Sequence, residues 1–92
     1  MGKEVIITVT TTATKLLDVM PLRKEYSIQN QGSVMVYLGI SDQVATSGTR
    51  KGRQLAPNGI EDANKDDNPE LIGLPLYAIA ESGTCVVWVW EA

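Results

Sequence analysis

The 92-residue chain contains no histidine and a single cysteine, Cys85. Without histidine it has no Ser-His-Asp triad, no Cys-His pair and no imidazole-bound zinc. One cysteine cannot form a disulfide within the chain. The sequence also lacks a run of 18 apolar residues, so we expect no transmembrane helix and no membrane partner. We therefore expect a protein that is not an enzyme, with no catalytic residues and no cofactor.

Basic residues are also scarce. Eight lysines and arginines stand against eleven aspartates and glutamates, for a net charge of −3. Phosphate binding needs a basic surface, so nucleic acid is not expected as a partner. The first residues lack a signal-peptide layout, which predicts a protein that is made and kept in a cytoplasm. The length fits a single domain over residues 1–92.

Apolar residues alternate with polar or small residues over much of the chain, and this period of two is typical of β-strands. The predicted strands cover residues 4–12, 14–19, 25–29, 34–39, 76–80 and 84–91. No segment has a convincing helical period. Short strands separated by turn signals predict an all-β fold, either a small antiparallel β-sandwich or a jelly-roll-like barrel with about six to eight strands.

Turn residues suggest how these strands connect. The sequence Asn-Gln-Gly-Ser at 30–33 predicts a β-hairpin with a central strand at 34–39, and Glu-Ser-Gly at 81–83 predicts a second hairpin. The Pro-Asn-Gly sequence at 57–59 predicts a tight turn. Residues 41–54 are interpreted as a loop or a weak edge strand, and the acidic stretch 61–70 as a solvated loop.

Two charged segments are candidate interaction sites. Asp62, Asn64 and Asp66 have the spacing that opens a calcium loop, but residue 67 is not glycine and no glutamate closes the loop, so we predict no metal. The basic residues Arg50, Lys51 and Arg53 have no Walker A spacing. We interpret these three residues either as a solvated loop tip or as a contact with an acidic protein surface.

The last predicted strand carries the remaining candidates. Cys85 alternates with valines and is interpreted as a small buried side chain, because no histidine is present to act as its base. Trp88 and Trp90 lie on one face of the strand, about 7 Å apart. The pair fits the core, a subunit interface or a platform for stacking sugars.

Several stretches taken together resemble a family. Residues 23–39, RKEYSIQNQGSVMVYLG, have a basic pair, a strand ending in Ile-x-Asn, a polar turn and a strand ending in Val-Tyr-Leu-Gly. The later sequences LAPNG and LYAIA-x-SGT follow in the same order. This pattern resembles small virion proteins of tailed bacteriophages. The acidic insertion at 61–75 departs from it.

The resemblance implies a β-sandwich on the capsid exterior, a decoration or cement protein that binds the major capsid protein and stabilises the shell. It also implies a homo-oligomer, with a trimer as one form. The alternatives are a neck, tail or fibre component and a receptor- or carbohydrate-binding module. The candidate interface residues are Arg50, Lys51, Arg53, Asp62, Asp66, Asp67, Trp88 and Trp90.

Overall fold

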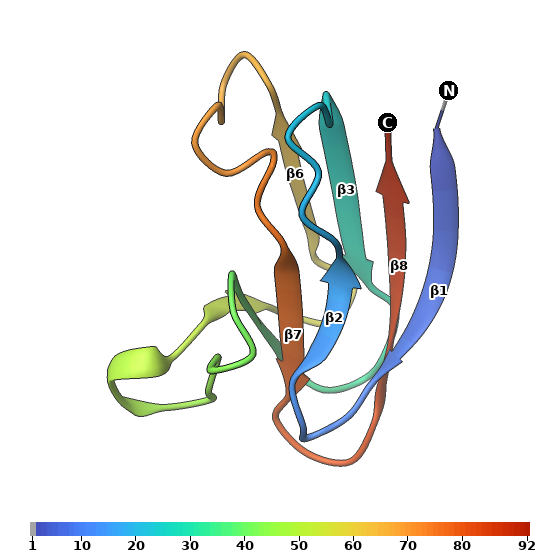
Figure 1. Ribbon diagram of the computed structural model, residues 1–92. Helices are drawn as coiled ribbons and strands as arrows, with labels where there is room; N and C mark the ends of the chain where they lie inside the picture. Colours follow the sequence, from blue (N-terminus) through green and yellow to red (C-terminus); the bar gives the residue numbers. More distant parts are fainter. Residues whose placement is uncertain (1) are drawn as a thin grey trace.

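The computed structural model describes residues 2–92 and consists of two packed β-sheets (Figure 1). The strands are β1 (Lys3–Val9), β2 (Thr14–Leu17), β3 (Glu25–Asn30), β4 (Val36–Gly39), β5 (Arg53–Leu55), β6 (Ile60–Asn64), β7 (Leu76–Ala80) and β8 (Cys85–Glu91). One 3-10 turn, η1 (Gly48–Arg50), precedes β5. Within residues 2–92, no helix has the length and apolar character needed to span a membrane.

The strand order defines the fold. One sheet has the order β1-β8-β3-β6 and the other has the order β2-β7-β4-β5, and all pairs are antiparallel. The chain passes from one sheet to the other at every connection except that between β4 and β5. This is the eight-stranded, double-sheet arrangement of a jelly roll. The predicted fold class is confirmed.

The core lies between the sheets and is built from the inward positions of the strands. In β8, Cys85, Val87 and Val89 are at most 2% exposed, and Ala78 and Ala80 of β7 face them from the other sheet. The adjacent Leu16 and Leu17 are both buried because the pairing of β2 with β7 shifts register between Lys15 and Leu17. The irregular pairing lets neighbouring residues both turn inward.

The strands of both predicted hairpins exist, but the predicted pairing within each hairpin is wrong. β3 and β4 belong to different sheets, as do β7 and β8. The reason is visible at Asn30, whose buried side-chain amide donates hydrogen bonds to the carbonyls of Val34 (2.8 Å) and Leu55 (2.9 Å). Those bonds tie the end of β3 to the opposite sheet, so residues 31–35 form a corner between the sheets.

The polar middle of the chain is more ordered than predicted. The acidic stretch is not all loop, because Ile60–Asn64 forms β6 and pairs with β3. The weak edge-strand option for 41–54 is correct only at its end, where β5 pairs with β4. Between β5 and β6, the Gly59 amide donates to the Ala56 carbonyl (2.8 Å) and Asn58 has φ 67°. The predicted turn is confirmed.

Candidate functional site

The face of the β1-β8-β3-β6 sheet that points away from the core carries both tryptophans. The alternation of β8 turns Cys85, Val87 and Val89 inward and places Val86, Trp88 and Trp90 on the outer face. Each tryptophan is half-buried, and Val86 is 39% exposed. The second apolar face of this strand is therefore not part of the core. We call this surface the outer face.

Strand register assembles further apolar side chains around the tryptophans. Trp88 pairs with Ile6 of β1 on one side and with Gln29 of β3 on the other, and Gln29 in turn pairs with Ile60 of β6. Ile6 is 56% exposed and Ile60 is 59% exposed. A row of large side chains thus crosses the whole sheet. The row is open to solvent at both ends.

The polar groups of the outer face are acidic. The indole Nε1 of Trp88 donates a hydrogen bond to Oε2 of Glu4 (3.1 Å), and the Ser27 hydroxyl donates to the Asp62 carboxylate. Glu25 shares this face, because it alternates with the buried Tyr26. The outward positions of these four strands carry no lysine or arginine. The surface therefore combines apolar area with negative charge.

The structure divides the predicted site residues into three groups. Trp88, Trp90 and Asp62 come together on the outer face, because Asp62 pairs with Ser27, which pairs with Trp90. Asp66 and Asp67 lie instead in the turn that follows β6. Arg50, Lys51 and Arg53 lie in and just before β5, in the other sheet, beside a hollow. The eight candidates do not form one site.

Arg53 is engaged within the molecule. Its guanidinium donates to both carboxylate oxygens of Glu61 (3.0 and 2.9 Å), and this hydrogen bonding raises the Arg53 pKa. The same carboxylate accepts a hydrogen bond from the Tyr26 hydroxyl (3.0 Å). Burial, followed by the charge of Glu61, raises the pKa of Tyr26 to about 12. This chain of contacts stabilises the open edge between β5 and β6.

The acidic stretch does not gather into a metal site. Among residues 2–92, no three acidic or cysteine side chains lie close enough to share an ion. Asn64 donates from its amide nitrogen to Asp67 Oδ2 (3.0 Å) and accepts from the Asp67 backbone amide (2.8 Å). The two residues close a local turn with each other. Cys85 is buried, and its thiol donates to Asn30 Oδ1 (2.9 Å).

Sequence reasoning missed the apolar flanks of the outer face and the position of Arg23. Ile6 and Ile60 occupy the otherwise polar phase of their strands, and that exception was the available signal. Arg23 is 1% exposed, although its sequence context shows only a basic pair next to Lys24. No pattern in the sequence indicates that one of two adjacent cations is buried.

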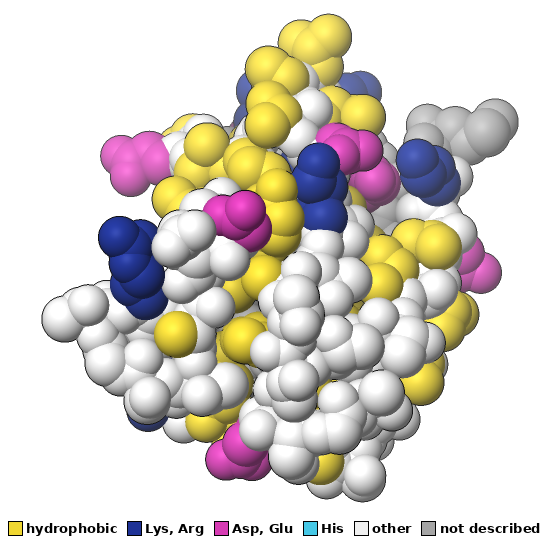
Figure 2. All heavy atoms as spheres, turned by 60° about the horizontal axis from the view of Figure 1, so that its bottom comes forward, with side chains coloured by type: hydrophobic (Ala, Val, Ile, Leu, Met, Phe, Trp, Pro, Cys, Tyr) yellow, Lys and Arg dark blue, Asp and Glu magenta, His cyan; other side chains and the backbone are white. Residues whose placement is uncertain are grey.

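Arg23 holds together one end of the sandwich. The loops joined by it, 18–24 and 65–75, present the exposed apolar side chains of Val19, Met20, Leu22 and Leu74. Figure 2 shows hydrophobic side chains gathered at this upper end, whereas the lower end is mostly uncharged polar atoms and backbone. We call this second apolar surface the apolar tip.

Comparisons with known proteins bear on the fold alone. No family model matches the chain, and no curated protein matches it significantly in sequence. A crystal structure of PirA superposes with a TM-score of 0.59 at 9% identity, covering 97% of this chain and 93% of that one. A de novo designed double-stranded β-helix gives 0.54 at 16% identity, covering 97% and 96%. Both likenesses span nearly the whole sandwich.

Proposed function

We propose that this chain is a structural protein of a tailed bacteriophage particle that decorates the capsid by docking its outer face on the major capsid protein. The observation that carries the proposal is the exposed row across one sheet of Ile6, Trp88 and Ile60, with Gln29 between the last two. Large apolar patches on small soluble domains mark interaction surfaces. The sequence resemblance to phage virion proteins supplies the kind of partner.

The composition of the face defines the complementary surface. Glu4, Glu25 and Asp62 surround or border the apolar row, with no cation among the outward positions. The capsid surface that fits is therefore an apolar patch with lysine or arginine around it, which gives electrostatic complementarity and selects the orientation. Tryptophan at the centre of such a contact is a frequent hot-spot residue.

A modest contact is sufficient for this role. Burial of apolar area contributes about 25 cal/mol per Å², so a patch of a few hundred Å² supplies several kcal/mol before the costs of association. A shell repeats the same contact at every symmetry-related position. Oligomers of the decorating protein then bind through several contacts at once, which raises the overall affinity.

Copy number in virions tests the location. Quantitative mass spectrometry of purified particles of the encoding phage should find the chain in numbers comparable to the major capsid protein. A few copies per particle would move it to the neck, tail or fibre. Its absence from virions would refute both versions of the proposal.

Surface variants test the docking face. Ile6→Lys and Ile60→Lys replace exposed side chains, so the fold is expected to survive, and each should reduce co-sedimentation with undecorated capsids at least tenfold. The matched control is Leu22→Lys, which places the same charge on the apolar tip, where Leu22 is 90% exposed. If Ile6→Lys and Ile60→Lys both bind capsids as well as the original chain does, the outer face is not the docking surface.

A second candidate function is carbohydrate binding on the same face. It is favoured by the half-buried Trp88 and Trp90 next to the hydrogen-bonding groups of Gln29 and Asp62, the mixture that stacks and orients sugars. Glycan-array binding that disappears in a folded Trp90→Ala variant would support it. Capsid binding that is lost on Ile60→Lys, with no glycan signal, would support decoration.

A further inference from the structure

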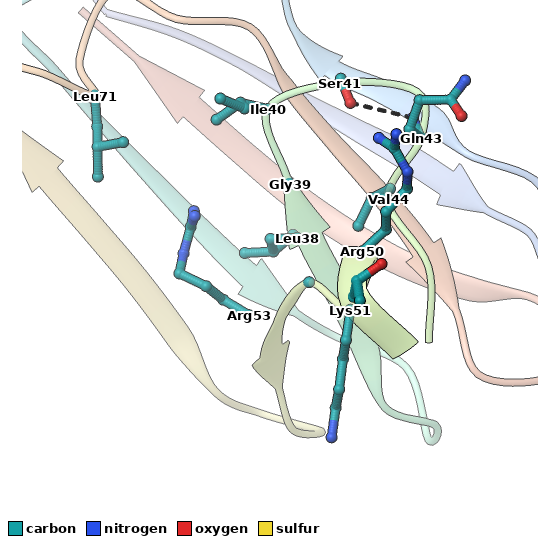
Figure 3. A pocket seen from close by; sticks show the side chains of 12 residues that line it. Leu38, Gly39, Ile40, Ser41, Gln43, Val44, Arg50, Lys51, Arg53 and Leu71 are labelled. Atoms are coloured by element: carbon teal, nitrogen blue, oxygen red, sulfur yellow. Dashed lines mark hydrogen bonds between the residues drawn. The ribbon is translucent and has the colours of Figure 1, made fainter. Parts of the chain in front are cut away.

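A hollow lies beside β4 and β5, in the sheet that does not carry the outer face. Its volume is about 420 Å³, and Leu38, Ile40, Val44 and Leu71 supply its apolar lining. Figure 3 shows Leu38, Ile40 and Leu71 turned toward the space next to Arg53. Ile40 is 51% exposed, so the lining is open to solvent.

Two cations next to this hollow are uncompensated. Arg53 is already paired with Glu61. Arg50 and Lys51 are exposed and form no ion pair within residues 2–92. The Lys51 ammonium lies 5.9 Å from the centre of the Tyr37 ring and extends away from the hollow (Figure 3). In the described part of the chain, Arg50 is therefore the unpaired cation beside the apolar lining of the hollow.

The opposite charge is presented by the segment that leads into the same hollow. Glu70 is exposed and forms no ion pair in the part of the chain that is described. Leu71 follows directly and lines the hollow. Within residues 2–92, the edge around the hollow thus carries an unpaired cation, Arg50, exposed apolar side chains and an unpaired anion, Glu70.

We propose that this edge is half of a two-fold contact between two copies of the chain, with Arg50 of each copy facing Glu70 of the other. In a two-fold contact the same surface is used twice, so a surface with both charges complements itself. Ile40 and Leu71 of the two copies meet at the centre. The inference is independent of the docking role proposed for the outer face.

Charge also favours the edge around the hollow over the outer face as the surface through which two copies of the chain contact each other. The outer face presents Glu4, Glu25 and Asp62 without a cation, so pairing it with itself brings like charges together. The edge with the hollow has both signs. A specific contact buries at least about 1,000 Å² in total, so each copy contributes about 500 Å². That is about a tenth of the 5384 Å² that one chain exposes.

Sedimentation velocity of the full chain between about 1 and 200 µM tests the proposal by giving mass and Kd together. We expect a monomer–dimer equilibrium at about 50 mM NaCl that weakens at about 500 mM, because salt screens exposed charges. Arg50→Glu and Glu70→Lys should each raise Kd at least tenfold, since the two-fold axis repeats the reversed contact. The control Glu81→Lys, in the turn after β7 at the bottom of Figure 1, should leave Kd unchanged.

Mixing the two variants gives the decisive result. In the mixed dimer, the glutamate introduced at position 50 of one copy faces the lysine introduced at position 70 of the other, and the second contact keeps Arg50 with Glu70. An equimolar mixture of Arg50→Glu and Glu70→Lys should therefore recover a Kd within about threefold of the original. Circular dichroism checks that both variants are folded. A monomer at all concentrations, a trimer, or a dimer insensitive to both substitutions would overturn the proposal.

Discussion

Arg23 is expected to be among the side chains on which stability depends most. Its Nε donates to Glu91 Oε1 (3.1 Å), its Nη1 to the carbonyls of Ile72 (2.9 Å) and Leu74 (3.2 Å), and its Nη2 to the Asp18 carbonyl (2.7 Å). One guanidinium therefore joins the loop after β2, the loop before β7 and the end of β8. Arg23→Met keeps a long apolar stem and removes every donor.

The expected loss of stability comes from the buried groups that lose their hydrogen-bond and charge partner when the guanidinium is removed. Removing one partner of a buried ion pair typically costs about 3–5 kcal/mol, because the other charge stays buried without compensation. The Glu91 side chain is still 15% exposed, which favours the lower end, and the carbonyls without donors add to the cost. Stabilities near 0.05–0.15 kcal/mol per residue give this domain about 5–14 kcal/mol in total. We expect a loss of about 3–5 kcal/mol and a Tm lower by about 15–30 °C.

Urea denaturation followed by tryptophan fluorescence measures this loss, since Trp88 and Trp90 both lie in β8 next to Glu91. Lys24→Met, at the exposed neighbouring position, is the matched control and should change stability by no more than about 0.5 kcal/mol. The double variant Arg23→Met/Glu91→Gln should cost less than the sum of its single substitutions. A loss below about 1 kcal/mol for Arg23→Met, or strict additivity, would show that the guanidinium does not hold this end together.

Three further outcomes are expected. Asn30→Ala removes a fully buried amide that bonds to Leu55 in one sheet and Cys85 in the other, and it should cost about 2–4 kcal/mol in urea denaturation. Gly32→Ala places a Cβ against the Cys85 sulfur and should cost about 1–3 kcal/mol, partly recovered by adding Cys85→Ala; no recovery would contradict the contact. The pKa of Tyr26 is raised to about 12 in the folded protein, whereas the phenol of the unfolded chain ionises near pH 10. The free energy of unfolding should therefore fall by about 1–2 kcal/mol between pH 10 and pH 12. In Tyr26→Phe, this contribution to the pH dependence should be absent.

The sequence was informative where structure depends on neighbouring residues. Alternation located β1 to β4, β7 and β8. It also assigned Cys85, Val87 and Val89 to one face of β8, and that face is buried. The Pro-Asn-Gly turn was predictable because Asn58 tolerates a positive φ. These features depend on local sterics and on period-two patterning.

Pairing partners were not predictable in the same way. Gly32 was interpreted as a hairpin glycine, yet its φ is not positive, and what it provides is space beside Cys85. β6 was missed because Asp62 faces solvent and Glu61 is engaged by Arg53 and Tyr26, so a paired strand looks like an acidic loop. Such contacts join residues far apart in the sequence, and alternation carries no information about them.

The alternation of strands between the sheets also has a kinetic consequence. No two consecutive strands are joined by a tight turn and paired, because the chain changes sheets everywhere except between β4 and β5, which are separated by a long loop. Folding therefore begins without a local hairpin and waits for segments such as β1 and β8 to meet from opposite ends of the chain. Proteins dominated by such non-local pairing fold in milliseconds to seconds. During that time the apolar strand VVWVW lacks partners, and dilute refolding should give a higher yield than concentrated refolding.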